Sequence, residues 1–251
     1  QLTRIQKLFL LSQMSINGWK LILLPMIIFV AYIGVANLFL ASFSIQSVMG
    51  DTKIHPISHN ENYLFVNIDT LPIVDINISF NKGSINDGEY PGLTNLMLNS
   101  LMASNYNNNK IISYFENVGA KLSYSVDKES LSIIIRSLSD LDQLIYLTSI
   151  VNKALFSNKL DNNILNLEKE KIKRSLDDSK KSPGSILEAS ISENLFSGTG
   201  LSHQILGNKD SIKKISNNMI LDHRDKIFNL NNIEINIVGD IDIKGAKRII
   251  S

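Results

Sequence analysis

Cysteine is absent from the 251 residues of this chain. Disulfide bonds, thiol nucleophiles and cysteine-ligated zinc sites are therefore excluded. A charge excess is also missing, because 25 Lys and Arg residues stand against 24 Asp and Glu residues. A protein that binds nucleic acid through a broad basic surface carries a clear positive excess, so we expect no nucleic-acid partner.

Charged residues are also missing from a long stretch after Lys20. Residues 21–44 are apolar and long enough to cross a bilayer as one helix of roughly 20 residues. Arg4, Lys7 and Lys20 precede this run, and the positive-inside rule places them in the cytoplasm. The sequence therefore predicts a cytoplasmic tail over residues 1–20 and an uncleaved transmembrane signal anchor over residues 21–44.

This topology predicts a single-pass protein of the inner (cytoplasmic) membrane with the bulk of the chain exported to the periplasm. A cleaved signal peptide is one alternative, although residues 21–44 exceed the usual apolar length of roughly 7–15 residues. A buried core helix is the other alternative.

Residues 45–61 are polar and irregular, and they predict a linker that leads to a domain over residues 62–251. His55 and His59 lie four residues apart in this linker, a spacing that can bind a metal on a helix. Pro56 lies between them and argues against a regular helix, and no third ligand is near. We therefore expect no metal site in the linker.

Periodic patterns predict the elements of the domain. Val74, Ile76, Ile78 and Phe80 alternate with polar residues, as in a half-buried strand. Apolar spacing, turn residues and capping residues predict the remaining elements. These are two strands within 121–138 around a turn at 127–129, a last strand at 232–241, helices at 92–104, 110–120, 140–156, 160–182, 183–196 and 216–229, and a loop at 197–212. This order predicts an α+β domain with helices covering one face of a mixed, mostly antiparallel sheet.

The order and several short motifs resemble the pitrilysin/insulinase family of zinc metallopeptidases, which includes the mitochondrial processing peptidase. In that family a strand leads to a Phe-x-x-Gly-Ser turn, an Asp and a Gly-Leu pair, and the inverted zinc motif His-x-x-Glu-His follows. Later segments are similar as well, from about residue 62 to the end. The matching residues here are Phe80, Gly83, Ser84, Asp87, Gly92 and Leu93.

The sequence departs from the family at the positions that carry its chemistry. By this resemblance the two His ligands fall on Asn95 and Asn99, and the catalytic Glu falls on Leu98. The third ligand is a Glu about two helical turns, roughly 7 residues, before a Pro, and it falls on Ser175. A catalytic zinc needs three protein ligands, and Leu98 cannot act as a general base. We therefore expect neither a metal site nor catalysis, and no cofactor, in this chain.

Active members of the family commonly work as pairs of similar domains that enclose a peptide-sized chamber. The resemblance thus implies a non-catalytic subunit of a heterodimer, in which a partner of the same family holds the zinc. This chain would complete the chamber and bind peptide or unfolded protein by strand addition. The chain opens on Gln1, and we expect it to be truncated before a second similar domain. The alternative is a membrane-tethered assembly module with no proteolytic role.

A third hypothesis is a hydrolase with displaced chemistry. Ser84, Asp87 and His203 could form a triad on paper, but Ser84 lies in a turn and not on a nucleophile elbow of the G-x-S-x-G type. His203 and His223 are isolated in the sequence, and we expect them on the surfaces of a loop and a helix.

Overall fold

The computed structural model describes residues 54–56, 62–229 and 231–250. The predicted tail and anchor (1–20 and 21–44) and His59 lie outside these residues. In the part that the structure describes, no helix is both long enough and apolar enough to cross a membrane.

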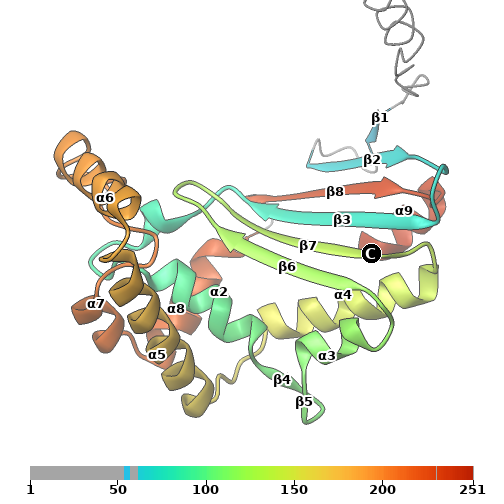
Figure 1. Ribbon diagram of the computed structural model, residues 1–251. Helices are drawn as coiled ribbons and strands as arrows, with labels where there is room; N and C mark the ends of the chain where they lie inside the picture. Colours follow the sequence, from blue (N-terminus) through green and yellow to red (C-terminus); the bar gives the residue numbers. More distant parts are fainter. Residues whose placement is uncertain (1–53, 57–61, 230, 251) are drawn as a thin grey trace, which may run out of the picture. The chain divides into compact units, whose positions relative to one another are not determined.

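A six-stranded sheet forms the centre of the domain (Figure 1). Its strand order is β1-β2-β8-β3-β7-β6, and every neighbouring pair is antiparallel except β2 and β8, which are parallel. The predicted mixed, mostly antiparallel sheet is confirmed. The strands are β1 (Ile54–Pro56), β2 (Tyr63–Asn67), β3 (Ile73–Phe80), β6 (Lys121–Val126), β7 (Leu131–Leu138) and β8 (Ile233–Gly239).

Helices gather on one side of this sheet (Figure 1), as the sequence predicts. A two-stranded hairpin, β4 (Asn105–Tyr106) and β5 (Asn109–Lys110), connects two of them. The helices are η1 (Ser84–Asn86), α2 (Leu93–Met102), α3 (Ile111–Glu116), α4 (Leu141–Leu155), α5 (Asn162–Ser179), α6 (Pro183–Leu195), α7 (Lys209–Lys214), α8 (Asn217–Ile227) and α9 (Ile243–Ile250).

The two faces of the sheet differ in chemistry because side chains alternate along each strand. Val74, Ile76 and Phe80 of β3 are buried toward the helices, as predicted, and Ile78 on the same face is partly buried against the core. On the opposite face, Asp75 pairs with Arg136 of β7 through two hydrogen bonds of 2.7 Å. The alternation of apolar and polar residues in β3 therefore predicts both the strand and the face that packs against the helices.

Several elements were not predicted. Residues 54–56 form β1 inside the expected linker, and β2 was also missed. The end of the predicted loop at 197–212 forms α7, whose N-cap Asn208 accepts hydrogen bonds from Asp210 N and Ser211 N. A further helix, α9, follows the last strand.

Candidate functional site

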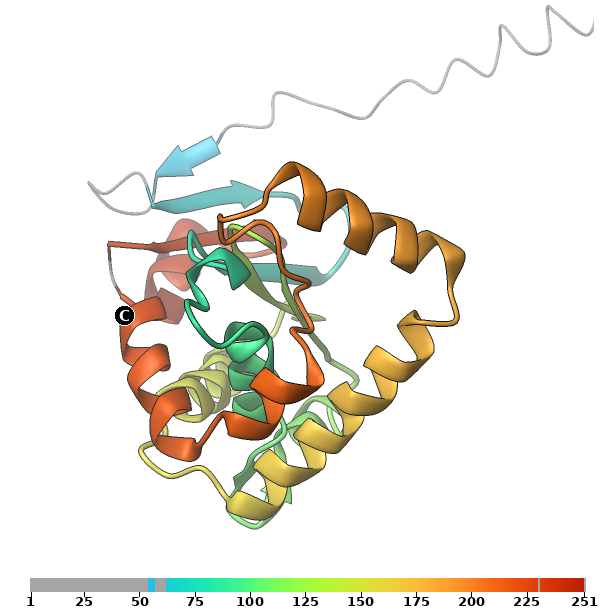
Figure 2. The same ribbon diagram turned by 90° about the vertical axis from the view of Figure 1, so that its left-hand side faces the viewer.

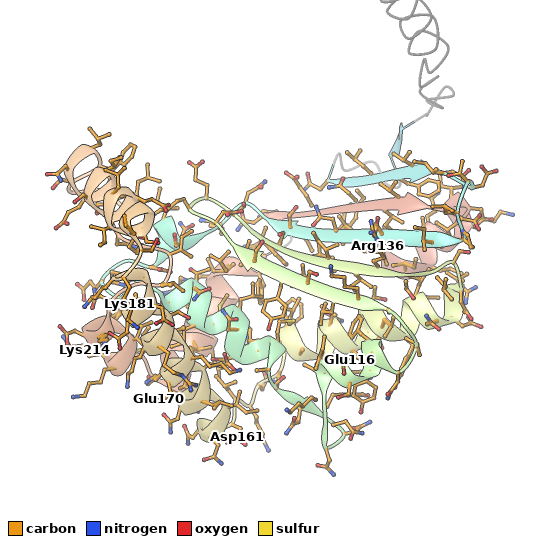
Figure 3. The ribbon with its side chains drawn as sticks, in the orientation of Figure 1. Glu116, Arg136, Asp161, Glu170, Lys181 and Lys214 are labelled. Carbon is orange, nitrogen blue, oxygen red and sulfur yellow. The ribbon has the colours of Figure 1, made fainter. Side chains whose placement is uncertain are left out.

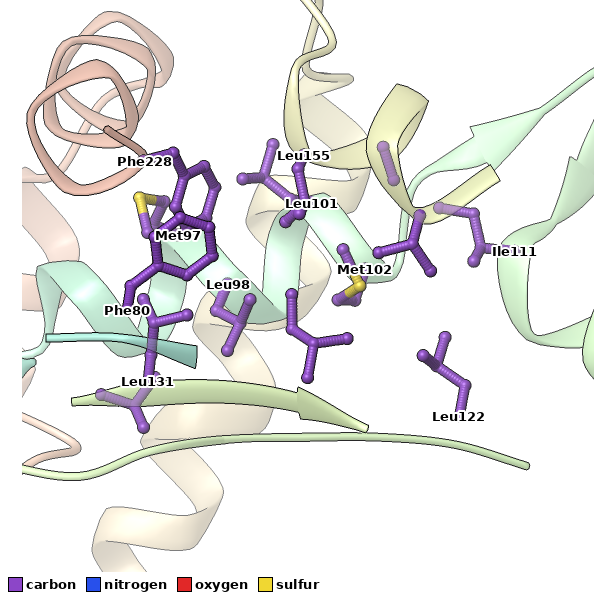
Figure 4. Close-up of a cluster of buried hydrophobic side chains, with 14 of the residues drawn as sticks. Phe80, Met97, Leu98, Leu101, Met102, Ile111, Leu122, Leu131, Leu155 and Phe228 are labelled. Carbon is purple, nitrogen blue, oxygen red and sulfur yellow. The ribbon is translucent and has the colours of Figure 1, made fainter. Parts of the chain in front are cut away.

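The candidate site is centred on α2, the helix that carries Asn95, Leu98 and Asn99. Eight of its ten residues are buried, including the four predicted to face the core: Leu93, Leu96, Met97 and Leu101. An isolated helix of this length is not stable in water, so packing holds it. Burial of each large aliphatic side chain contributes about 1.5–3 kcal/mol. Figure 4 shows α2 side chains packed toward the sheet and toward the pair Phe80–Phe228, whose rings are 4.7 Å apart.

The carboxylate of Asp87 stabilises the N-terminus of α2. Asp87 Oδ2 accepts a hydrogen bond from Gly92 N at 2.7 Å, and Oδ1 accepts from Thr94 N at 2.8 Å and from Thr94 Oγ1 at 2.5 Å. These bonds satisfy N–H groups that a helix leaves without intrahelical partners, and a negative charge is favourable there. Burial nevertheless raises the pKa of Asp87, because desolvation outweighs the stabilising bonds from Thr94 and Gly92.

His223 of α8 joins the same network, so its predicted place on a helix surface is wrong. Its side chain is buried, and Nε2 lies 2.8 Å from Thr94 Oγ1. Since Thr94 Oγ1 donates its proton to Asp87, we assign Nε2 as the donor to Thr94. Desolvation, with a smaller effect of Lys226, lowers the pKa of His223 to about 4. His223 is therefore neutral near pH 7 and connects α8 to α2.

The two Asn residues of α2 are partly buried and bond along the helix. Asn99 Nδ2 donates to Asn95 O at 2.8 Å and to Asn95 Oδ1 at 3.1 Å. Leu98 between them is fully buried in the core. The segment thus contributes two neutral amides and one aliphatic side chain, which offer neither a general base nor a set of good zinc ligands.

Helix α5 packs against α2, and the resemblance to the family places the third ligand on it. Ser175 is exposed, whereas the next residue, Leu176, is buried on the same side of α5 as Ile172 and Glu168. Helix phase therefore favours Leu176 over Ser175 as the residue that faces the domain core. Neither side chain is a carboxylate.

Glu168 is a buried acid on this side of α5 that the sequence did not single out. Its carboxylate pairs with Lys171 Nζ at 2.6 Å. Tyr124 of β6 lies close enough to feel this negative charge. Burial raises the pKa of Tyr124, and the charge of Glu168 raises it further by a smaller amount. The site therefore lies among α2, α5 and β6. In the part of the chain that the structure describes, no three His, Asp or Glu side chains form a group that could hold a metal ion.

Strand β6 borders this site and is an edge of the sheet. One of its sides pairs with β7, and no described strand pairs with the other. Leu122 and Val126 are buried, and Tyr124 is 37% exposed. An edge of this kind can accept an added strand through its main-chain groups.

The hypothetical triad of Ser84, Asp87 and His203 is not assembled. Ser84 is fully buried and its Oγ has no hydrogen-bond partner among the described residues. The Asp87 carboxylate is engaged at α2, and His203 Nδ1 lies 3.2 Å from Gln204 O. His203 is half-buried in its loop, and its Nε2 is buried without a hydrogen-bond partner among the described residues, so its predicted surface position is met only in part. A nucleophile needs a base within hydrogen-bond reach and access to substrate, and Ser84 has neither.

The model of the insulinase family of peptidases (peptidase family M16) matches residues 64–209, more than half of the chain. This chain belongs to the insulinase family. The resemblance seen in the sequence is thereby confirmed. No curated protein matches the chain.

Solved structures of the same family share the fold. An inactive M16 peptidase domain from Pseudomonas fluorescens superposes with a TM-score of 0.73 at 22% identity, over 79% of this chain and 48% of that chain. A protease from Helicobacter pylori gives 0.70 at 13% identity, over 79% and 49%. Pitrilysin gives 0.68 at 15% identity, over 81% and 23%. The chain thus spans less than half the length of each of these structures, and these identities show the fold alone.

The residues present do not fit the zinc that the insulinase family implies. Zinc prefers imidazole, thiolate or carboxylate donors. The α2 positions that the resemblance assigns to the zinc motif hold Asn95, Leu98 and Asn99, and the α5 candidates for the third ligand are Ser175 and Leu176. We therefore derive no chemical step through a metal in this chain.

Proposed function

We propose that this chain is the non-catalytic subunit of a membrane-anchored, exported peptidase of the insulinase family. One inference carries the proposal: α2 keeps its cap and its buried face, while the resemblance to the family assigns the positions of the zinc motif to Asn95, Leu98 and Asn99. A catalytic partner of the same family would supply the zinc and the general base, and this chain would complete the chamber.

Peptide binding is the role we assign to the region between β6 and the two helices. The main chain of β6 would pair with an extended peptide, which requires no metal and no catalytic side chain. Tyr124 would contact the side chains of the added strand, because it lies on the edge strand and is only partly covered. Tyr and similar side chains are suited to such contacts since they combine large apolar area with one polar group.

A membrane-tethered assembly module with no proteolytic role is the second candidate. The lost motif is compatible with it, since an assembly module needs the fold without the chemistry. A subunit of complex III2 from Candida albicans also shares the fold, with a TM-score of 0.62 at 20% identity. The two candidates differ in one respect: only the first predicts that peptide hydrolysis depends on this chain.

The decisive experiment combines the full chain with a family member from the same genome that carries an intact His-x-x-Glu-His motif. We expect hydrolysis of an unfolded peptide to require both chains. We also expect amide hydrogen exchange in β6 to slow when peptide binds, while β1, the other edge of the sheet, stays unchanged as an internal control. A mixture that gives no hydrolysis beyond that of the partner alone contradicts the first candidate and favours the second.

A further inference from the structure

The face of the sheet opposite the helices, here called the open face, carries a row of charged side chains that ends at the β6 edge. Residues directly opposite each other on neighbouring strands interact across such a face. Asp75 of β3 lies opposite Arg136 of β7, and Arg136 lies opposite Lys121 of β6. We call these three residues the Lys121 row. Lys121 is exposed and is the last member of the row, because β6 is an edge of the described sheet.

The charges of the Lys121 row do not balance. The carboxylate of Asp75 is already engaged, since each of its oxygens accepts a hydrogen bond of 2.7 Å from Arg136. Among the described residues, no acidic side chain forms an ion pair with Lys121. In Figure 3, Arg136 lies on the sheet, whereas Glu116, the nearest acidic residue before Lys121 in the chain, lies among the helices. Two cations and one anion leave a net charge of +1 in the row, and a further anion beside Lys121 would neutralise it.

The next two rows present small neutral side chains at the β6 edge. Ser123 lies opposite Ile134, and Ser125 lies opposite Ser132, with 3.1 Å between the two hydroxyl oxygens. Because serine is small, the open face is hollowed beside Lys121. The hollow has a volume of about 410 Å³ and is lined by Asp75, Asn77, Lys121, Ser123, Ile134 and Arg136. A long side chain from a strand added at the edge has room to reach the Lys121 row here.

The helix-facing side of β6 offers an apolar surface instead. Leu122 and Val126 are buried there, and Tyr124 is partly exposed. Glu168 of α5 lies near Tyr124, but Lys171 already pairs with it at 2.6 Å, so the two charges cancel. In Figures 1 and 2 the β1 and β2 edge lies above the rest of the sheet and α5 lies below it, so β6 is the edge nearer to α5. A strand added to β6 would thus meet apolar groups on one face and the Lys121 row on the other.

We propose that the peptide recognised at β6 is an extended segment of alternating apolar and polar residues, with a Glu or Asp opposite Lys121. Side chains of a strand alternate between its two faces, so apolar residues would lie toward the helices and polar residues on the open face. Opposite charges directly across two strands stabilise the pair, whereas like charges destabilise it. This inference rests on the peptide binding included in the proposed function and adds the class of peptide, with Lys121 as the residue that determines specificity.

Binding of labelled peptides to the full chain tests this charge preference without any hydrolysis. The host peptide alternates Ser and Val, carries fluorescein at one end, and has Glu, Gln or Lys in place of one central Ser. Fluorescence anisotropy gives the Kd of each peptide for the wild-type chain, Lys121→Glu and Lys244→Glu. Lys244 on α9 is the matched control, because it is also an exposed lysine, its replacement changes the net charge equally, and α9 packs against β2, far along the strand order from β6.

We expect the wild-type chain to bind the Glu peptide about two- to five-fold more tightly than the Gln peptide, and the Lys peptide most weakly. In Lys121→Glu the row holds two acids and one base, so the order of the three peptides should reverse. In Lys244→Glu the order should stay as in the wild-type chain. Added salt should narrow the differences, because Lys121 is exposed to solvent.

Equal affinities for the three peptides overturn the proposal but leave peptide binding at β6 intact. A reversal in both Lys→Glu variants also overturns it, because net charge and not Lys121 then sets the preference. If no peptide binds to any of the three proteins, the proposal fails together with strand addition at β6. Hydrolysis with the catalytic partner is measured separately, so the subunit role is judged independently of these results.

Discussion

The N-terminal cap of α2 and the segment 95–99 of the same helix differ sharply in how they are held. At the first turn, Asp87, Thr94 and His223 form a buried network in which short hydrogen bonds connect three segments of the chain. In the segment 95–99, by contrast, the side-chain hydrogen bonds of Asn95 and Asn99 to described residues stay within α2, and Leu98 is ordinary core. On the proposed assignment, the helix keeps the interactions that place it and lacks the residue types that would give it chemistry. Substitutions in the two turns can break or sharpen this contrast.

The largest loss of stability is expected when the family's Glu is placed at position 98. Leu98→Glu places a carboxylate in a fully buried site without a described partner and removes core packing. We expect a loss of about 3–5 kcal/mol in the free energy of unfolding. Leu98→Met, which nearly conserves volume, should cost less than about 1.5 kcal/mol. Urea unfolding of both variants measures the difference.

Adding Asn95→His and Asn99→His to Leu98→Glu recreates His-x-x-Glu-His on α2. We expect this triple variant to bind little zinc, because Ser175 and Leu176 on α5 provide no third ligand. Elemental analysis after dialysis measures the metal. One tightly bound zinc per chain would show that a ligand exists elsewhere and that the loss of the site is less complete than we infer.

The next largest effect is expected at Asp87. Asp87→Ala leaves Gly92 N, Thr94 N and Thr94 Oγ1 without their acceptor in a buried place. We expect a loss of about 2–3 kcal/mol in the free energy of unfolding. Asp87→Asn can still accept some of these bonds and should cost less. Equal costs for the two variants would contradict the assigned role of the carboxylate as a cap.

The pH dependence of stability tests His223. Its pKa is about 4 in the folded state and about 6.5 when unfolded, so the unfolded chain binds more protons between these values. Stability from this group is present above pH 6.5 and is lost as the pH falls toward 4, by up to about 3 kcal/mol. Asp87, whose pKa is raised, titrates with the opposite sign.

The contribution of His223 is isolated by comparing the wild-type chain with His223→Gln, which retains a donor for Thr94. We expect the wild-type protein to lose stability more steeply than the variant between pH 6.5 and 4 in urea titrations. Parallel curves for the two proteins would mean that His223 is not held neutral in the fold.

The smallest effect is expected at the two Asn residues. Asn95→Ala and Asn99→Ala each remove one within-helix contact in a partly buried position. We expect a change of less than about 1 kcal/mol and no change in hydrolysis by the assembled peptidase. A large loss of hydrolysis from either substitution would give these amides a direct role that the proposed function does not include.

Patterns with a short repeat predicted most of the fold. The alternation ending at Phe80 gave β3, the polar turn at 127–129 gave the β6–β7 hairpin, and Pro183 marks the first residue of α6. Strand β2 was missed because it is short and pairs in parallel with β8, some 170 residues later in the chain. Helix α9 was missed because Gly245 interrupts its pattern; a Cβ there would lie 2.7 Å from Ile241 Cγ1.

The site was predicted in part. The family frame placed Asn95, Leu98 and Asn99 on one helix, and the structure has them there. Burial of His223 could not be predicted, because it sits between Asp222 and Arg224 in a polar segment and its partner Thr94 lies 129 residues away. The choice between Ser175 and Leu176 depends on the phase of α5 within one residue, which spacing alone does not define. Figure 3 shows charged side chains along and after this helix, among them Glu170 and Lys181. Because charged residues separate its few apolar ones, the buried face of α5 is hard to define from the sequence.

Zinc content tests the central claim most directly. The full chain would be purified, dialysed against buffer with trace zinc, and analysed for bound metal alongside peptide hydrolysis. If the zinc site is absent, we expect far less than one zinc per chain and no peptide hydrolysis until a catalytic partner is added. One zinc per chain, with turnover that a chelator abolishes, would contradict the claim and show that Asn95, Leu98 and Asn99 do not occupy the positions of the family's zinc motif.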